Sequence, residues 1–341
     1  RVGVVSSDLG GAGRFSTLSP EGLPQLSFAP IHSDAVARYI DGRVYIVNRL
    51  RRDNIQVLNP AAFYTTQAEF STEPGSNPHD IVLADAGRAL ITRYERSTLW
   101  LADPRTGAPQ GLIDLGPYAD ADGIPEMSGM HNEGGRVFVA LQRLDRNSAL
   151  QVFPPTAYSS LIEIDAASNV VVAEHILPLK NPFGKLRNVT LFGQSHIVIA
   201  APGGIGAAYG FDGGVIAFQI STRTSRPGGI YSEATAGGDI LDVAVKNDRT
   251  AYATVLAPDL STTIQRFDPS TGVRTGQLAF YPASAGFVAG MSLAPDGRLF
   301  VADASSAQPG IAIYDTNQGD RLITPTPISV GLRPTDLIYI P

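Results

Sequence analysis

Histidine and carboxylate side chains are the groups of this chain that could do chemistry, because it contains no cysteine. The absence of cysteine removes disulfides, thiolate metal sites and cysteine nucleophiles together. The five histidines form no HExxH motif and no Gly-x-Ser-x-Gly sequence is present, so neither a zincin nor a serine-hydrolase motif can be read. His32 and His79 remain candidates for a base near neutral pH or for a shared transition metal, since each opens a segment typical of a strand.

A cluster of acidic residues marks the segment Pro117–Met130, PYADADGIPEMSGM. Asp120, Asp122 and Glu126 would supply hard oxygen ligands and Gly123 a turn, a combination that suits Ca²⁺. The alternative is a solvated acidic loop with ordinary Asp-Gly turn chemistry. The sequence leaves both open, and Ca²⁺ is the one cofactor that it suggests.

Further charged residues fall at the ends of apolar runs, where loops would gather them on one face. Loops on a rigid scaffold commonly carry binding residues, so we predict that this face binds a ligand. The predicted ligand-binding residues are His32, Arg49, His79, Arg93, Glu126, Arg143, Lys185, Asp239 and Arg333. They lie far apart in the sequence, so the site depends on the elements that bring them together.

A repeated unit of short apolar runs organises the whole chain. The stretch Phe287–Gly319 holds three such runs, separated by Pro295-Asp296-Gly297 and by a longer polar loop. Alternating apolar residues bounded by Asp-Gly predict strand, hairpin, strand, loop and strand. The residue after the hairpin turn recurs every 45 to 59 residues, at positions 43, 88, 136, 195, 249 and 298. This is the period of a four-stranded propeller blade.

The two ends of the chain indicate how the ring would close. Val2–Ser6 matches the second strand of the unit, and Pro334–Ile340 matches a first strand. Pairing them would complete a blade and remove two exposed strand edges. We therefore predict one all-β domain over residues 1–341, a seven-bladed β-propeller with four-stranded blades, closed by the C-terminal strand pairing with the N-terminal strands.

Four aspartates, Asp34, Asp80, Asp242 and Asp336, fall at what the repeat marks as one position. They could form a ring of carboxylates around a central cation. Alternatively, each could accept a hydrogen bond from a backbone N–H group of the next blade and so hold the blades together. We favour the second interpretation, because a residue that recurs in several repeats more often serves the fold.

The segment Asn77–Gly107, NPHDIVLADAGRALITRYERSTLWLADPRTG, resembles the repeat of bacterial YVTN- and NHL-type propellers. In that repeat a proline-containing first strand leads to a tight hairpin and an Asp-Pro-x-x-Gly turn. The strict YVTN tetrapeptide is absent, and Tyr45-Ile46-Val47-Asn48 comes closest. The resemblance implies a propeller fold in an exported or surface-associated bacterial protein, in a group that includes binding proteins, scaffolds and lactone hydrolases.

The composition excludes several classes of partner. A net charge of −6 without a basic cluster argues against nucleic acid, because phosphate binding needs concentrated lysine and arginine. No run of 18 apolar residues is present, so we expect no membrane span. The start at Arg1 leads us to expect a processed bacterial protein outside the cytoplasm, in the periplasm, at the cell surface or secreted.

We therefore predict an exported, non-enzymatic propeller that binds a protein, glycan or small-molecule ligand through the loops at the mouth of its channel. The alternative is a metal-dependent hydrolase of the lactonase type. In that alternative, Glu126, Asp239 and a histidine would hold a divalent cation that polarises a carbonyl and activates water.

Overall fold

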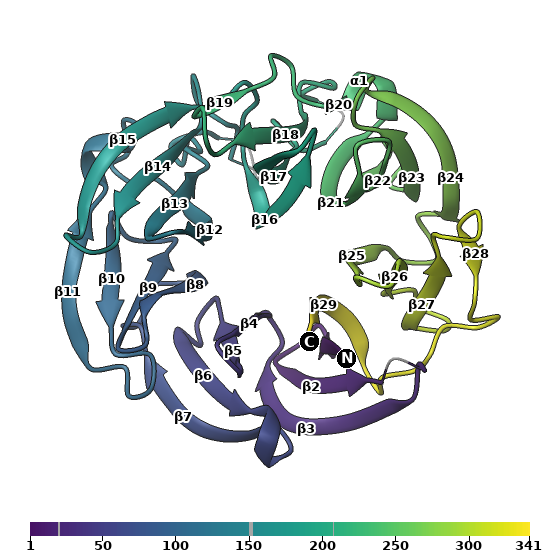
Figure 1. Cartoon of the computed structure of the whole chain (residues 1–341), viewed down its shortest axis with the longest axis horizontal. Helices are drawn as coiled ribbons and strands as arrows, with labels where there is room; N and C mark the ends of the chain where they lie inside the picture. The colour runs from purple at the N-terminus through teal and green to yellow at the C-terminus, as the bar shows by residue number, and fades with distance from the viewer. Residues whose placement is uncertain (20, 150–152, 207) are drawn as a thin grey trace.

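The structure is a computed structural model that describes residues 1–19, 21–149, 153–206 and 208–341. These residues form seven antiparallel sheets, arranged as blades around a central channel (Figure 1). This confirms the predicted seven-bladed β-propeller. The helical segments within the described ranges are short and lie in connections: η1 (Pro60–Ala62), η2 (Gly116–Tyr118) and α1 (Glu233–Ala236).

Each blade runs from an innermost strand at the channel to an outermost strand at the circumference. In this order, the first three blades are β29 (Arg333–Tyr339), β1 (Val2–Ser7), β2 (Ala12–Leu18) and β3 (Pro24–His32); β4 (Ala35–Ile40), β5 (Arg43–Asn48), β6 (Asn54–Asn59) and β7 (Thr65–Ser71); and β8 (Pro78–Asp85), β9 (Arg88–Arg93), β10 (Thr98–Ala102) and β11 (Pro109–Asp114).

The other four blades have the same order, and one of them carries an extra short strand, β20, beside its third strand. They are β12 (Met127–Glu133), β13 (Arg136–Leu141), β14 (Ser160–Asp165) and β15 (Val170–Ile176); β16 (Phe183–Leu191), β17 (Gln194–Ala201), β18 (Gly214–Gln219), β19 (Thr224–Ser225) and β20 (Tyr231–Ser232); β21 (Asp239–Asn247), β22 (Thr250–Leu256), β23 (Thr262–Asp268) and β24 (Val273–Tyr281); and β25 (Val288–Leu293), β26 (Arg298–Asp303), β27 (Gly310–Asp315) and β28 (Arg321–Leu322).

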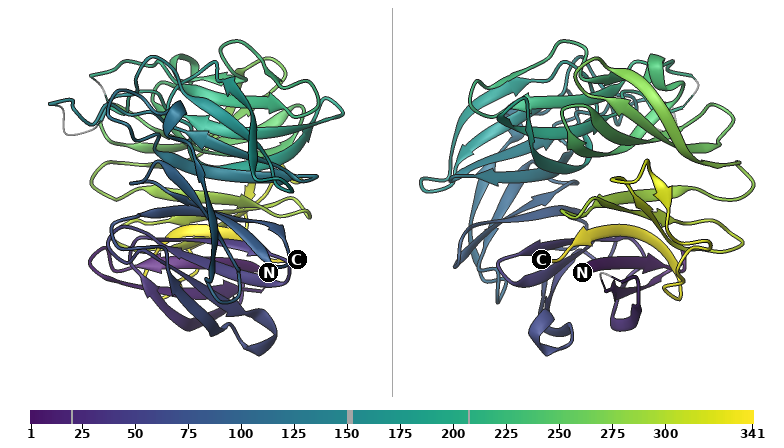
Figure 2. Two further views of the ribbon diagram at one scale, coloured as in Figure 1. Left: turned by 90° about the vertical axis from the view of Figure 1, so that its left-hand side faces the viewer. Right: turned by 45° about the vertical axis from the view of Figure 1, so that its right-hand side comes forward.

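The ring closes through the two ends of the chain, as the sequence predicts. Strand β29 pairs with β1, from Val2 opposite Tyr339 to Ser7 opposite Arg333. The amino group of Arg1 also donates a 2.7 Å hydrogen bond to the carbonyl of Ile340. The termini therefore lie side by side in both views of Figure 2.

The hydrophobic core is divided among the contacts between blades. Seven clusters of buried side chains are found in the described residues, and each joins two neighbouring blades. In one of them the ring of Phe138 in β13 meets that of Phe218 in β18 at 5.8 Å, both almost fully buried. Burying such a side chain stabilises a fold by about 1.5–3 kcal/mol, so the clusters stabilise the contacts between neighbouring blades. Trp100 in β10 belongs to another of these clusters.

The innermost strands form a closed circle around the channel. Each contacts the next in the order β29, β4, β8, β12, β16, β21, β25 and again β29. Side chains alternate between the faces of a strand, so a regular innermost strand sends every second residue toward the channel. The same described ranges contain no helix long and apolar enough to cross a membrane.

Candidate active site

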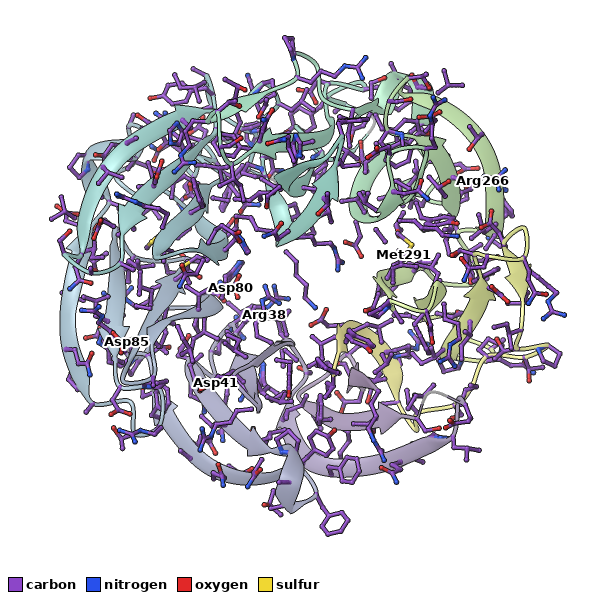
Figure 3. The ribbon with its side chains drawn as sticks, viewed as in Figure 1. Arg38, Asp41, Asp80, Asp85, Arg266 and Met291 are labelled. Carbon is purple, nitrogen blue, oxygen red and sulfur yellow. The ribbon has the colours of Figure 1, made fainter. Side chains whose placement is uncertain are left out.

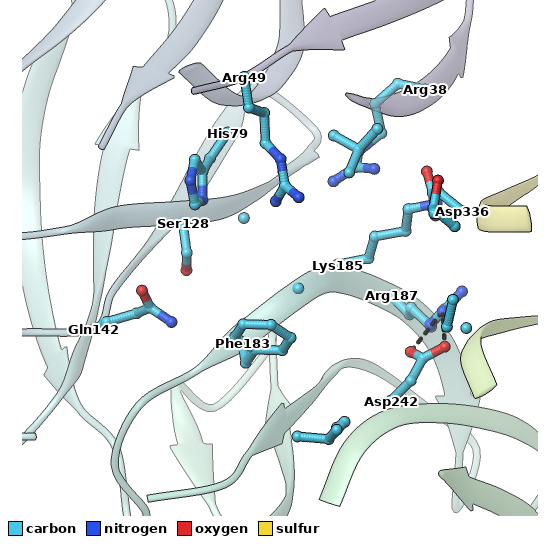
Figure 4. Close-up of a pocket in the computed structure, with 17 residues that line it drawn as sticks. Arg38, Arg49, His79, Ser128, Gln142, Phe183, Lys185, Arg187, Asp242 and Asp336 are labelled. Atoms are coloured by element: carbon cyan, nitrogen blue, oxygen red, sulfur yellow. Dashed lines mark hydrogen bonds and ion pairs between the residues drawn. The ribbon is translucent and has the colours of Figure 1, made fainter. Parts of the chain in front are cut away.

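The innermost strands enclose a cavity of about 190 Å³ within the channel, which we call the central cavity (Figure 4). Most of the polar side chains that line it are charged or can donate hydrogen bonds. They come from blades all around the ring: Arg38, Arg49, His79, Ser128, Gln142, Lys185, Arg187, Asp242 and Asp336, together with the ring of Phe183.

Three buried or half-buried ion pairs cross the wall of this cavity. Figure 3 shows Arg38 and Asp80 at the inner edges of neighbouring blades, and their Nε and Oδ1 atoms are 2.7 Å apart. The Nζ of Lys185 reaches from β16 to the Oδ1 of Asp336 in β29 at 2.5 Å. The Nη2 of Arg187 lies 2.8 Å from Oδ1 and 3.1 Å from Oδ2 of Asp242.

The aspartates of these pairs also hold neighbouring blades together. In each case the Oδ2 atom accepts a backbone N–H of the next innermost strand: Met130 N to Asp80 at 2.7 Å, Met291 N to Asp242 at 2.8 Å and Ala37 N to Asp336 at 2.9 Å. The structural interpretation of these residues is therefore confirmed for three of the four predicted aspartates.

Asp34 does not share this position, so its inclusion with the others was wrong. It precedes β4, and its carboxylate pairs with Arg49 instead of a backbone N–H of the next blade. Val36 pairs with Val47, the fifth residue of β5. Asp80 lies beside Thr92, which is likewise the fifth residue of its strand, β9. Val36, and not Asp34, is therefore the residue of β4 that is equivalent to Asp80. The sequence alignment of the repeats misplaced Asp34 because β8 and β21 contain register shifts that β4 lacks, so equal spacing from the hairpin does not mean an equivalent position.

Charge and burial together set the protonation of the cavity. Burial, with Arg38 and Arg187 nearby, lowers the pKa of Lys185 to about 8, although Asp336 opposes this shift. Burial raises the pKa of Asp336, but Lys185 and Arg38 outweigh it, so that pKa lies below its ordinary value. Near neutral pH Asp336 is therefore ionised and Lys185 is largely protonated.

His79 is a titratable side chain of the cavity that stays neutral near pH 7. Burial, with the charges of Arg49 and Arg38, holds its pKa well below the ordinary value. Its ring stacks on Tyr94 at 4.2 Å, which fixes its orientation. In the described part of the chain no side chain hydrogen-bonds its ring nitrogens, so one of them is free to accept a proton.

Three of the nine predicted ligand-binding residues meet at the central cavity: Arg49, His79 and Lys185. His32 lines a separate cavity with Asn48 and Gln56, and its Nδ1 accepts the N–H of Asp34. The two candidate histidines thus open into different cavities.

The other predicted residues are engaged elsewhere. Arg93 is almost fully buried and binds Glu73, with 2.5 Å between Nη1 and Oε2. The guanidinium of Arg143 lies 3.8 Å above the ring of Tyr158. The carboxylate of Asp239 accepts the N–H of Gly206, Arg333 pairs with Ser7 in the closing strand, and Glu126 lies in the acidic segment.

The acidic segment is tied down by an arginine. Glu126 is fully buried, and its carboxylate accepts the Nε of Arg146 at 2.5 Å and the N–H of Leu144 at 2.9 Å. Burial raises the pKa of Glu126 to about 7, against the effect of Arg146. Asp122 accepts the N–H of Arg146, while the buried Oδ2 of Asp120 has no partner in the described residues.

No group of three acidic or histidine side chains placed to hold a metal is found in these same ranges. The ligand set predicted for a metal-dependent lactonase is not assembled, because Glu126 binds Arg146 and Asp239 binds the N–H of Gly206. Calcium binding at Asp120, Asp122 and Glu126, one of the two interpretations that the sequence leaves open, is not tested by these contacts.

Sequence reasoning missed Arg38, Ser128 and Phe183 as cavity residues. Arg38 carried a readable signal, since it is a charged residue two positions after Val36 on the channel side of an apolar strand. Ser128 and Phe183 carried none, because their side chains reach the channel beside register shifts in β12 and β16.

No protein-family model matches the chain, and no curated protein matches its sequence. Among solved structures, a "putative 6-phosphogluconolactonase" from Bacteroides uniformis is similar over 99% of this chain and 98% of its own, with a TM-score of 0.64 and 14% identity. A protein of the same description from Bacteroides fragilis matches over 100% and 97%, with a TM-score of 0.62 and 14% identity. Dihydro-heme d1 dehydrogenase NirN matches over 99% of this chain and 74% of its own, with a TM-score of 0.60 and 16% identity.

These similarities show the fold alone. They support the YVTN/NHL resemblance as far as a bacterial propeller fold, and no family model confirms the family itself. They also overturn the prediction of a non-enzymatic binding protein. Propellers of this fold carry the names of a dehydrogenase and of lactonases, and no finding supports export. Activity must be argued from the cavity itself.

Proposed function

We propose that the protein is a hydrolase that opens a small anionic lactone, or cleaves a related ester, in the central cavity. The observation that carries this proposal is a neutral histidine, His79, in the same cavity as the cations of Arg38, Arg49, Lys185 and Arg187. The names of the two Bacteroides proteins support the lactone class. Of the predicted classes of partner (protein, glycan or small molecule), this proposal selects a small molecule.

The cations can bind an anion although each already has a carboxylate partner. A guanidinium has five N–H donors, and the ion pairs use only some of them. The buried Nε of Arg187 has no partner among the described residues. Figure 4 shows Arg38, Arg49 and Lys185 extending into the same space. A phosphate or carboxylate there would accept charge-assisted hydrogen bonds, which are stronger than neutral ones.

The reaction follows from these two kinds of group. The oxygen of a water attacks the carbonyl carbon, and His79 accepts the proton that this water loses. The arginine and lysine donors stabilise the negative charge that develops on the carbonyl oxygen. The bond between the carbonyl carbon and the ring oxygen then breaks, and the proton passes from His79 to the leaving oxygen. The products are a hydroxyl group and a carboxylic acid, which releases its proton to water near neutral pH and becomes a carboxylate.

A panel of lactones and esters tests this proposal. The panel pairs anionic members, such as 6-phosphogluconolactone and a carboxylated dihydrocoumarin, with the neutral glucono-δ-lactone and dihydrocoumarin. We expect faster turnover of anionic members. His79→Gln should lower kcat by about 10²–10⁴-fold, the usual contribution of a general base. Arg49→Gln should raise KM for anionic members.

His131→Gln is the matched control. His131 also lies on an innermost strand, but it pairs with Glu133 and is not one of the residues that line the central cavity. Its substitution should leave turnover unchanged. Absence of turnover across the panel, or turnover that survives in His79→Gln, would overturn the proposal.

We also propose descent from YVTN/NHL-type repeats, supported by the tight hairpin at Ala86-Gly87 and the turn at Asp103–Gly107, both of which the structure contains. An extracytoplasmic location stays a prediction of the sequence.

A further inference from the structure

A second cavity, of about 410 Å³, lies directly above the central cavity and opens to solvent; we call it the mouth cavity. Its wall is more apolar than that of the central cavity, although Asp34, Arg49 and Asp242 also line it. Three large apolar side chains line it and stay unusually exposed: Leu9 at 52%, Phe183 at 41% and Phe287 at 41%. Exposed apolar side chains that gather around one opening commonly mark a binding site.

These side chains are held in place by ordered backbone. The Oδ1 of Asp8 accepts the N–H groups of Gly10, Gly11 and Ala12 at 2.8 to 3.0 Å, which fixes the turn that presents Leu9. Leu9 itself adopts a φ of +61°, a conformation that costs a leucine energy.

The two aromatic side chains of the mouth are held in the same way. Phe183 begins β16 and pairs with Ala200, and the carbonyl of Phe287 accepts the N–H of Ala304 at 2.9 Å. The main chain therefore holds both residues at the mouth.

The mouth cavity and the central cavity are continuous. Both are lined by Arg49, Phe183 and Asp242, so a single ligand can contact the apolar rim and the cations together. Below, Arg38, Lys185 and Arg187 separate the central cavity from a third cavity on the far side of the ring. The path from the mouth thus runs from apolar side chains down to a charged floor.

We propose that the natural ligand is amphipathic, with an acyl or aryl group against Leu9, Phe183 and Phe287 and a carboxylate or phosphate at the cations below. This proposal names the substrate class of the proposed hydrolase. Only the reaction rests on the proposed function, because binding of the ligand can be measured without turnover. A wholly polar phosphosugar would leave the apolar rim uncovered.

Calorimetric titration with straight-chain carboxylates tests the proposal. The series runs from acetate through hexanoate and octanoate to decanoate, below micelle-forming concentrations, with decanol as the neutral comparison. Each methylene buried should tighten Kd roughly fourfold, from about 0.8 kcal/mol per methylene. Phe287→Ser should weaken decanoate by about tenfold and leave acetate unchanged, and Phe183→Ser, which lines both cavities, should also weaken decanoate by about tenfold. Arg49→Gln should weaken both carboxylates.

Phe280→Ser is the matched control, because Phe280 is 57% exposed but lies on the outermost strand β24. It should bind decanoate like the parent protein. Chain-length-independent binding, or decanol binding as tightly as decanoate, would overturn the proposal. The proposal would also be overturned if the parent protein did not bind decanoate and formed a dimer that Phe287→Ser abolished, because the apolar rim would then serve self-association.

The two proposals fail in different ways. Decanoate binding without turnover of any lactone would refute the hydrolase and leave the amphipathic ligand. Turnover of polar anionic lactones, with no gain in kcat/KM from an added acyl or aryl group, would refute the amphipathic ligand and leave the hydrolase.

Discussion

Removing the carboxylate of Asp80 should weaken the contact between two blades by a measurable amount. The side chain of Asp80 is fully buried, and Asp80→Ala would leave the N–H of Met130 without its acceptor and Arg38 without its counter-ion. A buried unpaired donor costs about 1–3 kcal/mol, and breaking a buried ion pair about 3–5 kcal/mol. These costs overlap, and Arg38 retains some exposure through which water can solvate its charge. We therefore expect a total loss of about 3–5 kcal/mol.

Calorimetry would measure this loss as a fall in Tm. An unfolding entropy of about 2.1 cal/mol/K per residue gives about 0.7 kcal/mol/K for this chain, so Tm should fall by about 4–7 °C. Asp34→Ala is the control, because its exposed pair with Arg49 contributes about 1 kcal/mol or less. Hydrogen exchange adds a local readout: the amide of Met130 should lose protection in Asp80→Ala, and that of Met291, held by Asp242, should keep it. Equal falls of Tm in both variants, or an unchanged Met130 amide, would refute the reasoning.

Three further predictions follow from the closure, the cavity and the acidic segment. Deleting residues 334–341 removes β29 and should open the ring; a truncated protein that stays monomeric with its parent Tm would contradict this. The rate of lactone hydrolysis should persist at pH 6, because the lowered pKa keeps His79 neutral there, and KM for anionic substrates should rise above pH 8 as Lys185 loses its proton. Lys185→Met should abolish that rise in KM, and a rate that falls away between pH 7 and 6 would argue against His79. Millimolar Ca²⁺ should leave Tm unchanged, because Arg146 already offsets the charge of Glu126; a rise in Tm that Asp122→Ala abolishes would instead establish the calcium site.

The fold could be predicted because its signal is local and repeated. A hairpin needs only a few adjacent residues, and the turns at Asp41-Gly42 and Asp296-Gly297 mark the start of a second strand wherever they occur. Even the closure was readable, since the segment that pairs with Val2–Ser7 has the pattern of a first strand. Each of these inferences uses residues that are close in sequence or equivalent by repetition.

The site could be predicted only in part, because it joins single residues from distant blades. Lys185 and Asp336 are 151 positions apart, and no spacing rule relates them. Register shifts in the innermost strands also decide which side chain faces the channel, as at Phe183, and the sequence does not mark them. Arg49 and His79 were found because they lie at strand ends, where the repeat locates the loops.

The cations of the central cavity and the contacts between blades depend on the same carboxylates. In each of three aspartates Oδ2 accepts a backbone N–H of the next blade while Oδ1 holds a cation: Asp80 with Arg38, Asp242 with Arg187 and Asp336 with Lys185. The three aspartates occupy one position of the repeat, whereas their cationic partners do not. The repeat therefore accounts for the carboxylate of each ion pair and not for the cation. Substituting an aspartate should therefore lower Tm and disturb binding together. Substituting a cation should also lower Tm, because it leaves a buried carboxylate without its counter-ion, but the N–H group of the next blade keeps its acceptor and should keep its protection from hydrogen exchange. This difference separates the residues that build the ring from those that recognise the ligand.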